Sequence, residues 1–399
     1  MNILVLNCGS SSIKYQLLDM SGEPELKAKG LVERIGLEKG ILTHKTQSGL
    51  KFEIEQAIPE HTVGIKLVLA ALTDEKHGVI KSLNEIKAVG HRVVHGAEDF
   101  CESIVINSEV IKKIEECCNI APLHNPANLL GINAILAVLP NVHQVAVFDT
   151  AFHQTMLPKA FIYPVPYETY KKYQFRRYGF HGTSHKFVAE KACNILGWDI
   201  KSKKIITCHL GNGASICAIE NGKSVDTSMG FTPVEGLEMG TRVGDIDPGA
   251  LLFLMEKENM DLKQANNYIN KKSGMLGVSE GISDMRDIMK AADEGNNNAK
   301  LAFDIFIYRV KKYIGSYIAA MNGVDLIIMT GGIGENAFRV RKEVFQNMEF
   351  LGIDFDEKAN DQLFGQDKII STDYSKIKVM TITTDEELVI ATDTLHLIS

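Results

Sequence analysis

The sequence lacks an excess of positive charge, since its 43 lysines and arginines are outnumbered by 50 aspartates and glutamates. A surface that binds nucleic acid is basic, so the net charge of −7 argues against a nucleic-acid partner. The sequence also lacks any run of 18 apolar residues, and we therefore expect no membrane span. The apolar run at residues 3–6 is short and has no basic leader, which is not the pattern of a signal peptide.

Cysteine is scarce and unpatterned: there are seven, an odd number, and no C-x-x-C pair occurs. This argues against a disulfide framework and against a zinc site built from cysteines. Free thiols fit a reducing compartment, so we expect a cytoplasmic protein. The Walker sequence G-x-x-x-x-G-K-[ST] is absent as well, which excludes a P-loop kinase at the level of motif.

What the sequence does contain is ordinary for a globular protein, with 45% hydrophobic and 23% charged residues. A length of 399 residues predicts two or three domains, although no low-complexity linker divides the chain. We place the boundary just after a strand expected at residues 142–148. This gives an N-terminal domain at 1–150 and a C-terminal domain at 151–385, with residues 386–399 forming a helix that returns to the first domain.

One pattern occurs twice, about two hundred residues apart. Apolar strands are expected at residues 3–6 and 13–18, with a Gly/Ser loop between them. Strands at 205–208 and 215–219 enclose a second Gly-rich loop, and Asn221-Gly222 then forms a strong hairpin turn. The spacings differ slightly, so the repeat is weak, but both copies carry a turn suited to approach phosphates.

Three Gly-rich loops are candidates for phosphate binding, because phosphates need backbone N–H groups and small residues that admit the backbone. The first, residues 7–12, is followed by Lys14, but taken alone it is more typical of a Ser-rich hairpin. The second, residues 209–213, is commonly just a turn. The third, residues 331–336, contains a loose dinucleotide fingerprint that would favour a dehydrogenase, although that motif belongs in the first βα turn of a Rossmann unit.

Charged side chains near these loops leave alternatives open. Arg92 lies in an apolar, strand-like run, so it needs an anionic partner, which is either a structural ion pair or a carboxylate substrate. Arg242 lies between glycines in a loop that is either a solvated acidic turn or faces a ligand. Asp149 follows the strand at 142–148, and ligands of open α/β sheets collect at such carboxyl ends. Glu386 either belongs to the charged start of the last helix or binds magnesium.

Two further patterns concern a histidine pair and a helix start. His181 and His185 have an H-x-x-x-H spacing, which makes a poor zinc site because the Glu of H-E-x-x-H is missing. Asn125-Pro126 is typical of a helix start, and the helix is expected to include residues 129–139.

Together these segments resemble the acetate kinase family. The matching motifs occur in the family's order, span nearly the whole chain, and are jointly specific although each is weak alone. They are N-x-G-S-S-S-x-K at 7–14, H-R-V-V-H-G at 91–96, F-D-T-A-F-H at 148–153, Y-G-x-H-G-T-S-H at 178–185, H-L-G-N-G at 209–213, G-T-R-x-G-D-x-D-P-G at 240–249 and G-G-I-G-E-N at 331–336.

The resemblance implies an α/β protein with a duplicated actin-like (ribonuclease H-like) two-domain fold, in which mixed sheets are flanked by helices. It implies reversible, ATP-dependent phosphorylation of acetate, or a similar short carboxylate, to the acyl phosphate by direct in-line transfer. Mg²⁺ is the implied cofactor, for which Mn²⁺ is expected to substitute, and ATP and ADP are the nucleotide substrates. The family also suggests a homodimer.

The resemblance implies roles for individual residues. The catalytic residues would be Asp149, His181 and Arg242. The acyl substrate would be bound by Arg92, Val94, Leu123, Phe180 and Pro233. The nucleotide and its phosphates would be bound by Lys14, His209, Leu210, Gly211, Asn212, Gly213, Asp284, Met285, Arg286, Gly332, Ile333, Gly334, Glu335 and Asn336. The metal ligands would be Asn7 and Glu386.

Two positions depart from the family pattern: Met285 stands where Phe is frequent, and Asp385 stands where Asn is usual. Neither removes a proposed catalytic group. Asp149 matches an aspartate sometimes described as a proton donor or acceptor. A carboxylic acid has an ordinary pKa near ~4 and is already ionised at neutral pH. We therefore expect Asp149 to orient an arginine or the magnesium shell, while Arg242, His181 and magnesium neutralise charge and Arg92 fixes the carboxylate.

Three other functions remain open from the sequence. A propionate or butyrate kinase is the nearest, because one methylene is worth only ~1–3 kcal/mol of discrimination. A non-enzymatic, nucleotide-gated binding protein on the same fold would need an extra substrate domain or polymerising inserts. A dehydrogenase would need to bind NAD without ATP.

Overall fold

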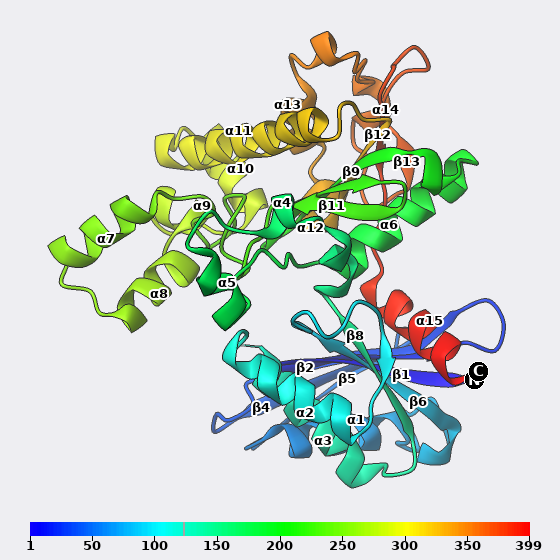
Figure 1. The fold of residues 1–399 in the computed structure, drawn as a ribbon. Helices are drawn as coiled ribbons and strands as arrows, with labels where there is room; N and C mark the ends of the chain where they lie inside the picture. The colour runs from blue at the N-terminus through cyan, green and yellow to red at the C-terminus, as the bar shows by residue number, and fades with distance from the viewer. Residues whose placement is uncertain (123) are drawn as a thin grey trace. The chain divides into compact units, whose positions relative to one another are not determined.

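The computed structural model describes residues 1–122 and 124–399, which form two compact units. Unit 1 comprises Met1–Ala151 and Asp385–Ser399, and unit 2 comprises Phe152–Thr384. Each unit contains one mixed β-sheet with helices packed on it (Figure 1). Within the described residues, we find no helix with the length and apolar character that crossing a membrane requires.

The sheet of unit 1 joins an antiparallel meander to parallel strands. Strands β1 to β5 run antiparallel in sequence, whereas β6 and then β8 continue the sheet parallel to β1, and β7 pairs antiparallel at the edge. In sheet order the strands are β5 (Lys51–Gln56), β4 (Gly40–Thr46), β3 (Glu25–Glu33), β2 (Ser12–Asp19), β1 (Asn2–Gly9), β6 (Ile86–Val93), β8 (His143–Phe148) and β7 (Ile104–Val105).

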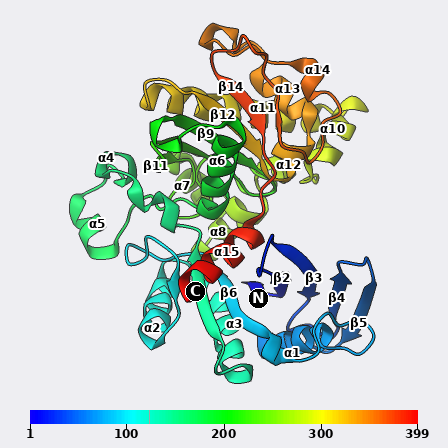
Figure 2. The ribbon, with the colours of Figure 1, turned by 90° about the vertical axis from the view of Figure 1, so that its right-hand side faces the viewer.

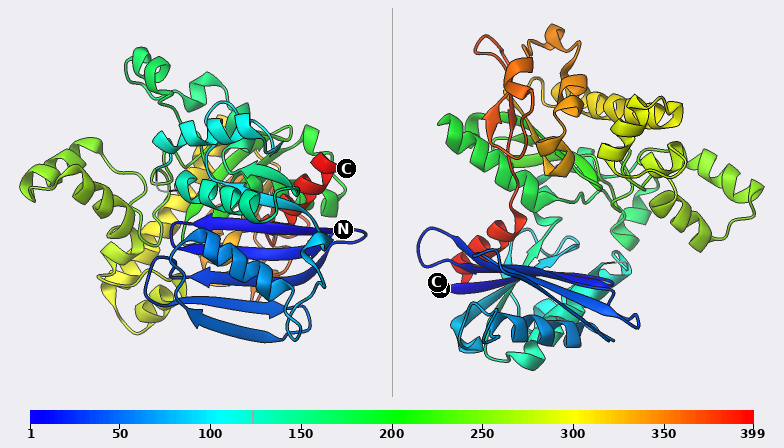
Figure 3. Two further views of the ribbon diagram at one scale, coloured as in Figure 1. Left: turned by 90° about the horizontal axis from the view of Figure 1, so that it is seen from below. Right: turned by 180° about the vertical axis from the view of Figure 1, so that it is seen from behind.

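Strand β1 is apolar on both faces because both faces are covered. Leu4 and Leu6 face the core under α1 (His61–Leu72) and α3 (Asn125–Val138), whereas Ile3 and Val5 pack with α15 (Glu386–Ile398) on the other face. Helix α2 (Ser108–Glu116) packs beside α3. Figure 3 shows α15 (red) and α1 (blue) on opposite faces of this sheet.

The sheet of unit 2 repeats the same order of strands. Strands β9 to β11 form an antiparallel meander, and β12 and then β14 lie parallel to β9. In sheet order the strands are β11 (Lys223–Thr227), β10 (Ala214–Glu220), β9 (Lys204–Leu210), β12 (Leu326–Thr330), β14 (Lys378–Thr381) and β13 (Lys368–Ile369). The order β3-β2-β1-β6-β8 of unit 1 therefore recurs as β11-β10-β9-β12-β14, which confirms the predicted duplicated actin-like fold.

Two long helices flank the sheet of unit 2 (Figure 2). Helix α6 (Gly182–Leu196) packs its apolar stripe on β9, β10 and β12, and α11 (Asn297–Ala320) also packs on β9 and β10. The other helices of this unit are α4 (Pro158–Phe161), α5 (Tyr167–Tyr173), α7 (Pro248–Lys257), α8 (Leu262–Lys271), α9 (Gly274–Val278), α10 (Met285–Asp293), α12 (Gly331–Asn336), α13 (Phe338–Phe345) and α14 (Glu357–Asn360).

Most of the strands, turns and helices expected from the sequence are present, and two expectations are wrong. The hairpin at Asn221-Gly222 is present, with φ of 55° and 78°. The third Gly-rich loop is wrong as a loop, since residues 331–336 form helix α12. Gly331 permits this sharp entry because its φ is +76° and a Cβ there would lie 2.7 Å from the Leu210 carbonyl oxygen. The strand-like run that contains Arg92, residues 91–96, is a strand only as far as Val93, and side chains of α3 accept hydrogen bonds from the amides of the next two residues.

Candidate active site

The parallel strands of unit 1 end side by side, and each delivers a predicted site residue near its carboxyl end. Asn7 lies in β1, Arg92 in β6, and Asp149 directly after β8. Arg92 donates from Nε to both oxygens of Asp149 at 3.0 and 3.1 Å, and from Nη2 to Oδ2 at 2.5 Å. Asp149 is only 2% exposed, whereas the Arg92 side chain retains 24%. The carboxylate therefore fixes the guanidinium plane and leaves part of it accessible.

Charges of unit 1 gather around this pair. Burial disfavours the charged guanidinium of Arg92, but the Asp149 and Glu386 carboxylates outweigh it and raise its pKa. Burial also raises the pKa of Glu386, and nearby Asp149 adds to that rise while Arg92 opposes it. Lys14, which pairs with Asn7 across the β1–β2 hairpin, forms an ion pair with Glu387. Three carboxylates thus share two cationic side chains.

The predicted magnesium ligands fit a divalent cation chemically. Glu386 begins α15, whose cap is the side chain of Asp385 accepting from the Leu388 amide. Within the described residues, the Glu386 carboxylate takes part in no hydrogen bond and no ion pair. Carboxylate and amide oxygens are the ligands that Mg²⁺ prefers, and Asn7 and Glu386 supply them. No cluster of three or more His, Cys, Asp or Glu residues suited to a metal occurs in the part of the chain that is described.

Two asparagines that the sequence reading did not single out as site residues hold the loop after Arg92. Asn128 of α3 accepts from the Val94 amide at 3.1 Å and donates to the Cys8 carbonyl at 2.9 Å. Asn125 accepts from the His95 amide and donates to its carbonyl. Both asparagines are at most 3% exposed. Val94, two residues after Arg92, is buried. Leu123, the other predicted apolar pocket residue of this unit, lies outside the described residues.

In unit 2, His181 stands at the start of α6 in a left-handed conformation with φ of 57°. Its Nδ1 lies 2.9 Å from the Ser215 hydroxyl, and its ring stacks on His209 with centroids 4.3 Å apart. Phe180, one residue earlier, is 4% exposed, and its carbonyl bonds to the buried His153 ring at 3.0 Å. The ring of His181 is therefore held on its Nδ1 side and on one face.

Arg242 is half-buried and has no anionic partner among the described residues. Its Nη1 donates at 3.5 Å to the carbonyl of Pro233 and lies 3.8 Å from the Met239 sulfur. Within the described residues it forms no ion pair, and burial lowers its pKa. Burying a charge that has no partner is costly, which favours an anionic ligand at this position. The same Nη1 and the His181 ring approach one point, since a Cβ on Gly213 would lie 3.4 Å from Nη1 and 3.7 Å from His181 Nε2.

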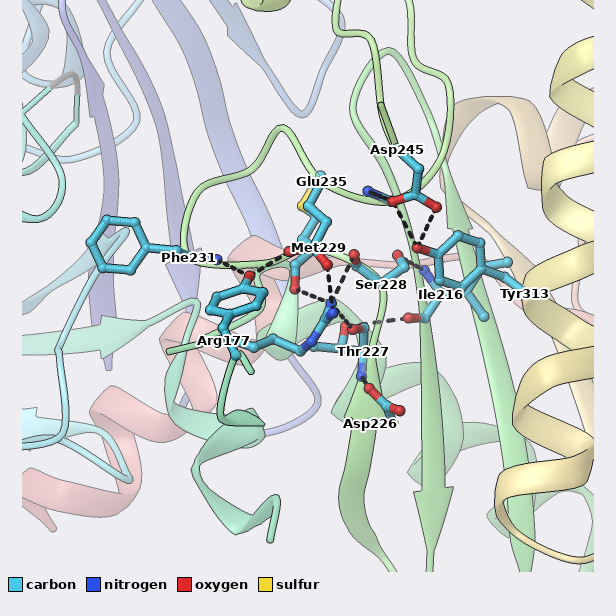
Figure 4. A network of polar contacts seen from close by, with 12 residues as sticks. Arg177, Ile216, Asp226, Thr227, Ser228, Met229, Phe231, Glu235, Asp245 and Tyr313 are labelled. Atoms are coloured by element: carbon cyan, nitrogen blue, oxygen red, sulfur yellow. Dashed lines mark hydrogen bonds and ion pairs between the residues drawn. The ribbon is translucent and has the colours of Figure 1, made fainter. Parts of the chain in front are cut away.

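The loop that carries Pro233 and Arg242 is anchored by a polar network (Figure 4). Arg177 donates from Nη1 to the carbonyls of residues 227, 228 and 229 at 2.8 to 3.3 Å, and from Nη2 to Glu235 at 2.5 Å. Further along, Asp245 exchanges hydrogen bonds with Gly236, and the Tyr313 hydroxyl donates to its carboxylate at 2.9 Å. Hydrogen bonds therefore hold the loop on both sides of the segment that carries Arg242.

A cavity of about 1130 Å³ lies wholly within unit 2. Its lining includes predicted nucleotide-binding residues from three segments: Gly211, Asn212, Asp284, Met285, Arg286, Gly332, Ile333 and Asn336. The lining also includes Ser283, Met289, Lys290, Asp293, Glu294, Ala337, Phe338, Arg339 and Phe364, which the sequence reading missed. The lining therefore combines two aromatic side chains with both basic and acidic ones.

Six predicted nucleotide-binding residues do not line this cavity. They are Lys14, His209, Leu210, Gly213, Gly334 and Glu335. Leu210 is buried in β9, and Gly334 packs on the backbone of β12. Glu335 accepts from the amides of Gly331 and Thr384, both at 3.0 Å, so its carboxylate is bound to backbone. His209 bonds to Ser184 and stacks on the His181 ring, which in turn lies near Gly213.

The repeated strand order and the cavity at the strand ends define a protein of the duplicated actin-like class. The model of the acetokinase family matches residues 2–392. Acetate kinase of Lachnoclostridium phytofermentans is 57% identical over 398 residues, with 100% of both chains covered. The solved structure of Porphyromonas gingivalis acetate kinase has a TM-score of 0.97 at 52% identity, covering 100% of both chains. A propionate kinase from Francisella tularensis has a TM-score of 0.92 at 41% identity, with the same coverage.

The chain therefore belongs to the acetokinase family, and the predicted enzyme class, a phosphotransferase, is confirmed. Membership of this family displaces the dehydrogenase alternative drawn from the Gly332-x-Gly334 fingerprint.

Proposed function

We propose that this enzyme phosphorylates acetate with ATP, reversibly and with Mg²⁺, by direct in-line transfer of the phosphoryl group. The observation that carries the proposal is Arg242, a half-buried arginine without an ion pair among the described residues, whose Nη1 approaches the same point over Gly213 as the His181 ring. A tetrahedral anion meets that requirement, and a cavity of about 1130 Å³ for the rest of a nucleotide lies in the same unit.

Each unit supplies a distinct part of the chemistry. Phosphoryl transfer needs in-line positioning and neutralisation of charge on the equatorial oxygens. Arg242 and His181 donate hydrogen bonds to those oxygens, and the backbone at Gly213 leaves the space for them. Arg92 binds the acyl carboxylate and is oriented by Asp149 through Nε and Nη2. Because the acceptor is already ionised, Asp149 has no proton to remove, and its contact with Arg92 supports an orienting role.

Magnesium would be held by Asn7 and Glu386, and when bound it supplies positive charge to the nucleotide phosphates. Glu386 supports this assignment, because its half-buried carboxylate lies near Asp149 and forms no ion pair or hydrogen bond among the described residues. Lys14 would reach the phosphates by exchanging its partner Glu387 for the nucleotide. Mn²⁺ is expected to substitute, since oxygen ligands suit both ions.

Propionate is the second candidate substrate. It is favoured by the similarity to a propionate kinase that is 41% identical and shares the whole fold. The described pocket residues Val94 and Phe180 are buried and apolar. Acetate is favoured by the greater identity of the acetate kinases, at 52% and 57%. One methylene is worth only ~1–3 kcal/mol, so a graded preference is expected.

A homodimer is supported by helix α7, whose sequence Pro-Gly-Ala-Leu-Leu-Phe-Leu-Met-Glu-Lys is apolar although none of its residues is buried. Leu252 is 66% and Phe253 57% exposed. An apolar helix whose large side chains stay exposed in its own chain is typical of a surface covered by a second copy. The cytoplasmic location is supported by Cys8, Cys208 and Cys217, whose thiols are free, buried and raised in pKa by that burial.

The test is a coupled assay of ADP release with acetate, propionate and butyrate, each with and without Mg²⁺. We expect Mg²⁺-dependent turnover that is fastest with acetate and declines with chain length. Turnover with none of the three acids would contradict the proposed function, and a higher kcat/KM with propionate would replace acetate by the second candidate.

A further inference from the structure

Ser215, a residue of β10 that is fully buried, bridges two histidine rings. Its hydroxyl lies 2.9 Å from Nδ1 of His181 and 2.8 Å from Nε2 of His185. His185 continues the chain, because its Nδ1 lies 2.7 Å from the Thr207 hydroxyl of β9. His185 and Thr207 are also fully buried. A linear relay of four side chains therefore runs from the protein interior to the ring of His181.

Each member of this relay has a limited set of hydrogen-bond roles. A serine hydroxyl has a single proton, so it donates to at most one of the two histidine nitrogens and accepts from the other. Burial, reinforced by His153 and His209 nearby, keeps the pKa of His185 well below its ordinary value, so this ring is neutral and has one N–H. Two orders of donation then use the proton of Ser215 within the chain, and they run in opposite directions.

The ligand that faces His181 selects between these two orders. Phosphoryl oxygens only accept hydrogen bonds, so Nε2 of His181, the nitrogen near Gly213, has to carry the proton. In a neutral ring Nδ1 is then an acceptor, and it takes the proton of Ser215. Ser215 in turn accepts from Nε2–H of His185, and Nδ1 of His185 accepts from the Thr207 hydroxyl. Every member donates once or accepts once at each contact, and none is left unpaired.

We propose that Ser215 is a positioning residue that holds His181 in its neutral Nε2–H tautomer, aimed at the transferring phosphoryl group. The proposal rests on the proposed function for the identity of the ligand. The reverse order would turn a lone pair of His181 toward an anion, which repels it. His181 thus donates to the phosphoryl group without having to be protonated, so its contribution does not fade as pH rises through the ordinary imidazole range near 6.5.

The direct test is the protonation of His181 itself, read by ¹⁵N–¹H correlation of the imidazole rings in the ATP-bound wild-type protein at pH 8. We expect Nε2 of His181 to carry the proton and Nδ1 to have the shift of an acceptor. A proton on Nδ1 would overturn the proposal. This readout needs no turnover, so it stands even if the enzyme proves to use another acid, and the assay with three acids tests the proposed function separately.

The kinetic test compares Ser215→Ala with Ser215→Cys, which keeps a weak donor. We expect the kcat of the wild type to stay within about threefold between pH 6 and 8.5, and that of Ser215→Ala to lose about tenfold more over this interval, with KM for ATP changed less than kcat. Ser215→Cys should recover part of the loss.

Ser224→Ala is the matched control, because Ser224 is a fully buried serine in the same sheet that bonds to Nδ1 of His153 at 2.8 Å. It should keep the pH profile of the wild type. A pH profile of Ser215→Ala that is parallel to that of the wild type would contradict a role in setting the tautomer.

Discussion

Arg242 and His181, which come from different loops of unit 2, approach the same point over Gly213. Nη1 of Arg242 lies 3.4 Å and Nε2 of His181 3.7 Å from where a Cβ at position 213 would stand. Those separations are ordinary contact distances, so the protein tolerates a methyl group there, whereas a phosphoryl group could not share the space. We therefore expect Gly213 to be required by the proposed phosphoryl ligand rather than by the fold.

The variant Gly213→Ala should therefore separate folding from catalysis. We expect an unchanged melting temperature together with a kcat lowered by about 10²-fold or more, because the added methyl displaces the phosphoryl group from both donors. Gly315→Ala is the matched control: Gly315 is exposed in α11 and a Cβ there meets nothing within 4 Å. Full activity of Gly213→Ala would show that the phosphoryl group binds elsewhere.

Arg242→Ala should lower kcat by about 10²–10⁴, the range for groups that stabilise a transferring phosphoryl group. Steady-state kinetics with saturating ATP and acetate measure this, and Arg34→Ala, which removes an exposed arginine of unit 1, serves as control. Turnover within about threefold of the wild type would mean that Arg242 does not have this role.

Arg92 and Asp149 should act as a unit, because the arginine holds the carboxylate with two nitrogens. We expect Arg92→Ala to raise mainly the KM for acetate, and Asp149→Asn to do so as well by loosening the guanidinium. The double variant should lose little more than the worse single variant, with a coupling free energy of about 1–3 kcal/mol in kcat/KM. An unchanged KM for acetate in Arg92→Ala, or additive losses, would contradict the assignment.

Glu238 should make the stability of this protein depend on pH. It is 4% exposed, neither carboxylate oxygen has a hydrogen-bond partner among the described residues, and burial raises its pKa to about 8, with Arg309 opposing the rise. A carboxyl group whose pKa is raised on folding binds its proton more tightly in the folded state. Its stabilisation is complete below the unfolded pKa of 4.5 and is lost as pH rises through about 8.

Glu238→Gln removes this titration. Relative to this variant, the wild type should lose up to about 1.4 kcal/mol of unfolding free energy per pH unit between pH 5 and 8. Denaturant unfolding at several pH values measures the difference, and equal slopes for the two proteins would show that Glu238 is not buried as a neutral acid.

The sequence allows the strand order to be anticipated where apolar runs and turns are local, as at residues 3–18 and 205–222. Arg92 could be predicted to need an anion, but its partner Asp149 is 57 residues away, and only the pairing of β6 with β8 brings them together. Helix α12 could not be predicted because glycine disfavours a helix, and three of its six residues are glycines. The chain enters this helix at Gly331, whose φ is positive and which lies against the backbone of Leu210.

Other parts of the site have no local signal at all. Ser215 is an ordinary serine in an apolar strand by sequence. Its proposed role follows from hydrogen bonds to the rings of His181 and His185, which are 34 and 30 residues away. The sequence around Asn125 predicts a helix start, yet the side-chain amide of Asn125 also bonds to the backbone N–H and carbonyl of His95. Phe338 and Phe364 line the cavity through packing of segments that the sequence does not relate. The residues that touch a ligand are more readily recognised by motif than those that hold them in place.

The measurement that tests the central claim most directly is identification of the product formed from ATP and acetate. Hydroxylamine trapping of the acyl phosphate, run alongside ADP release with Mg²⁺ present, counts both products in one reaction. We predict one acyl phosphate for each ADP, with both lost in Arg242→Ala. Release of ADP with inorganic phosphate and no trapped acyl group would contradict phosphorylation of a carboxylate.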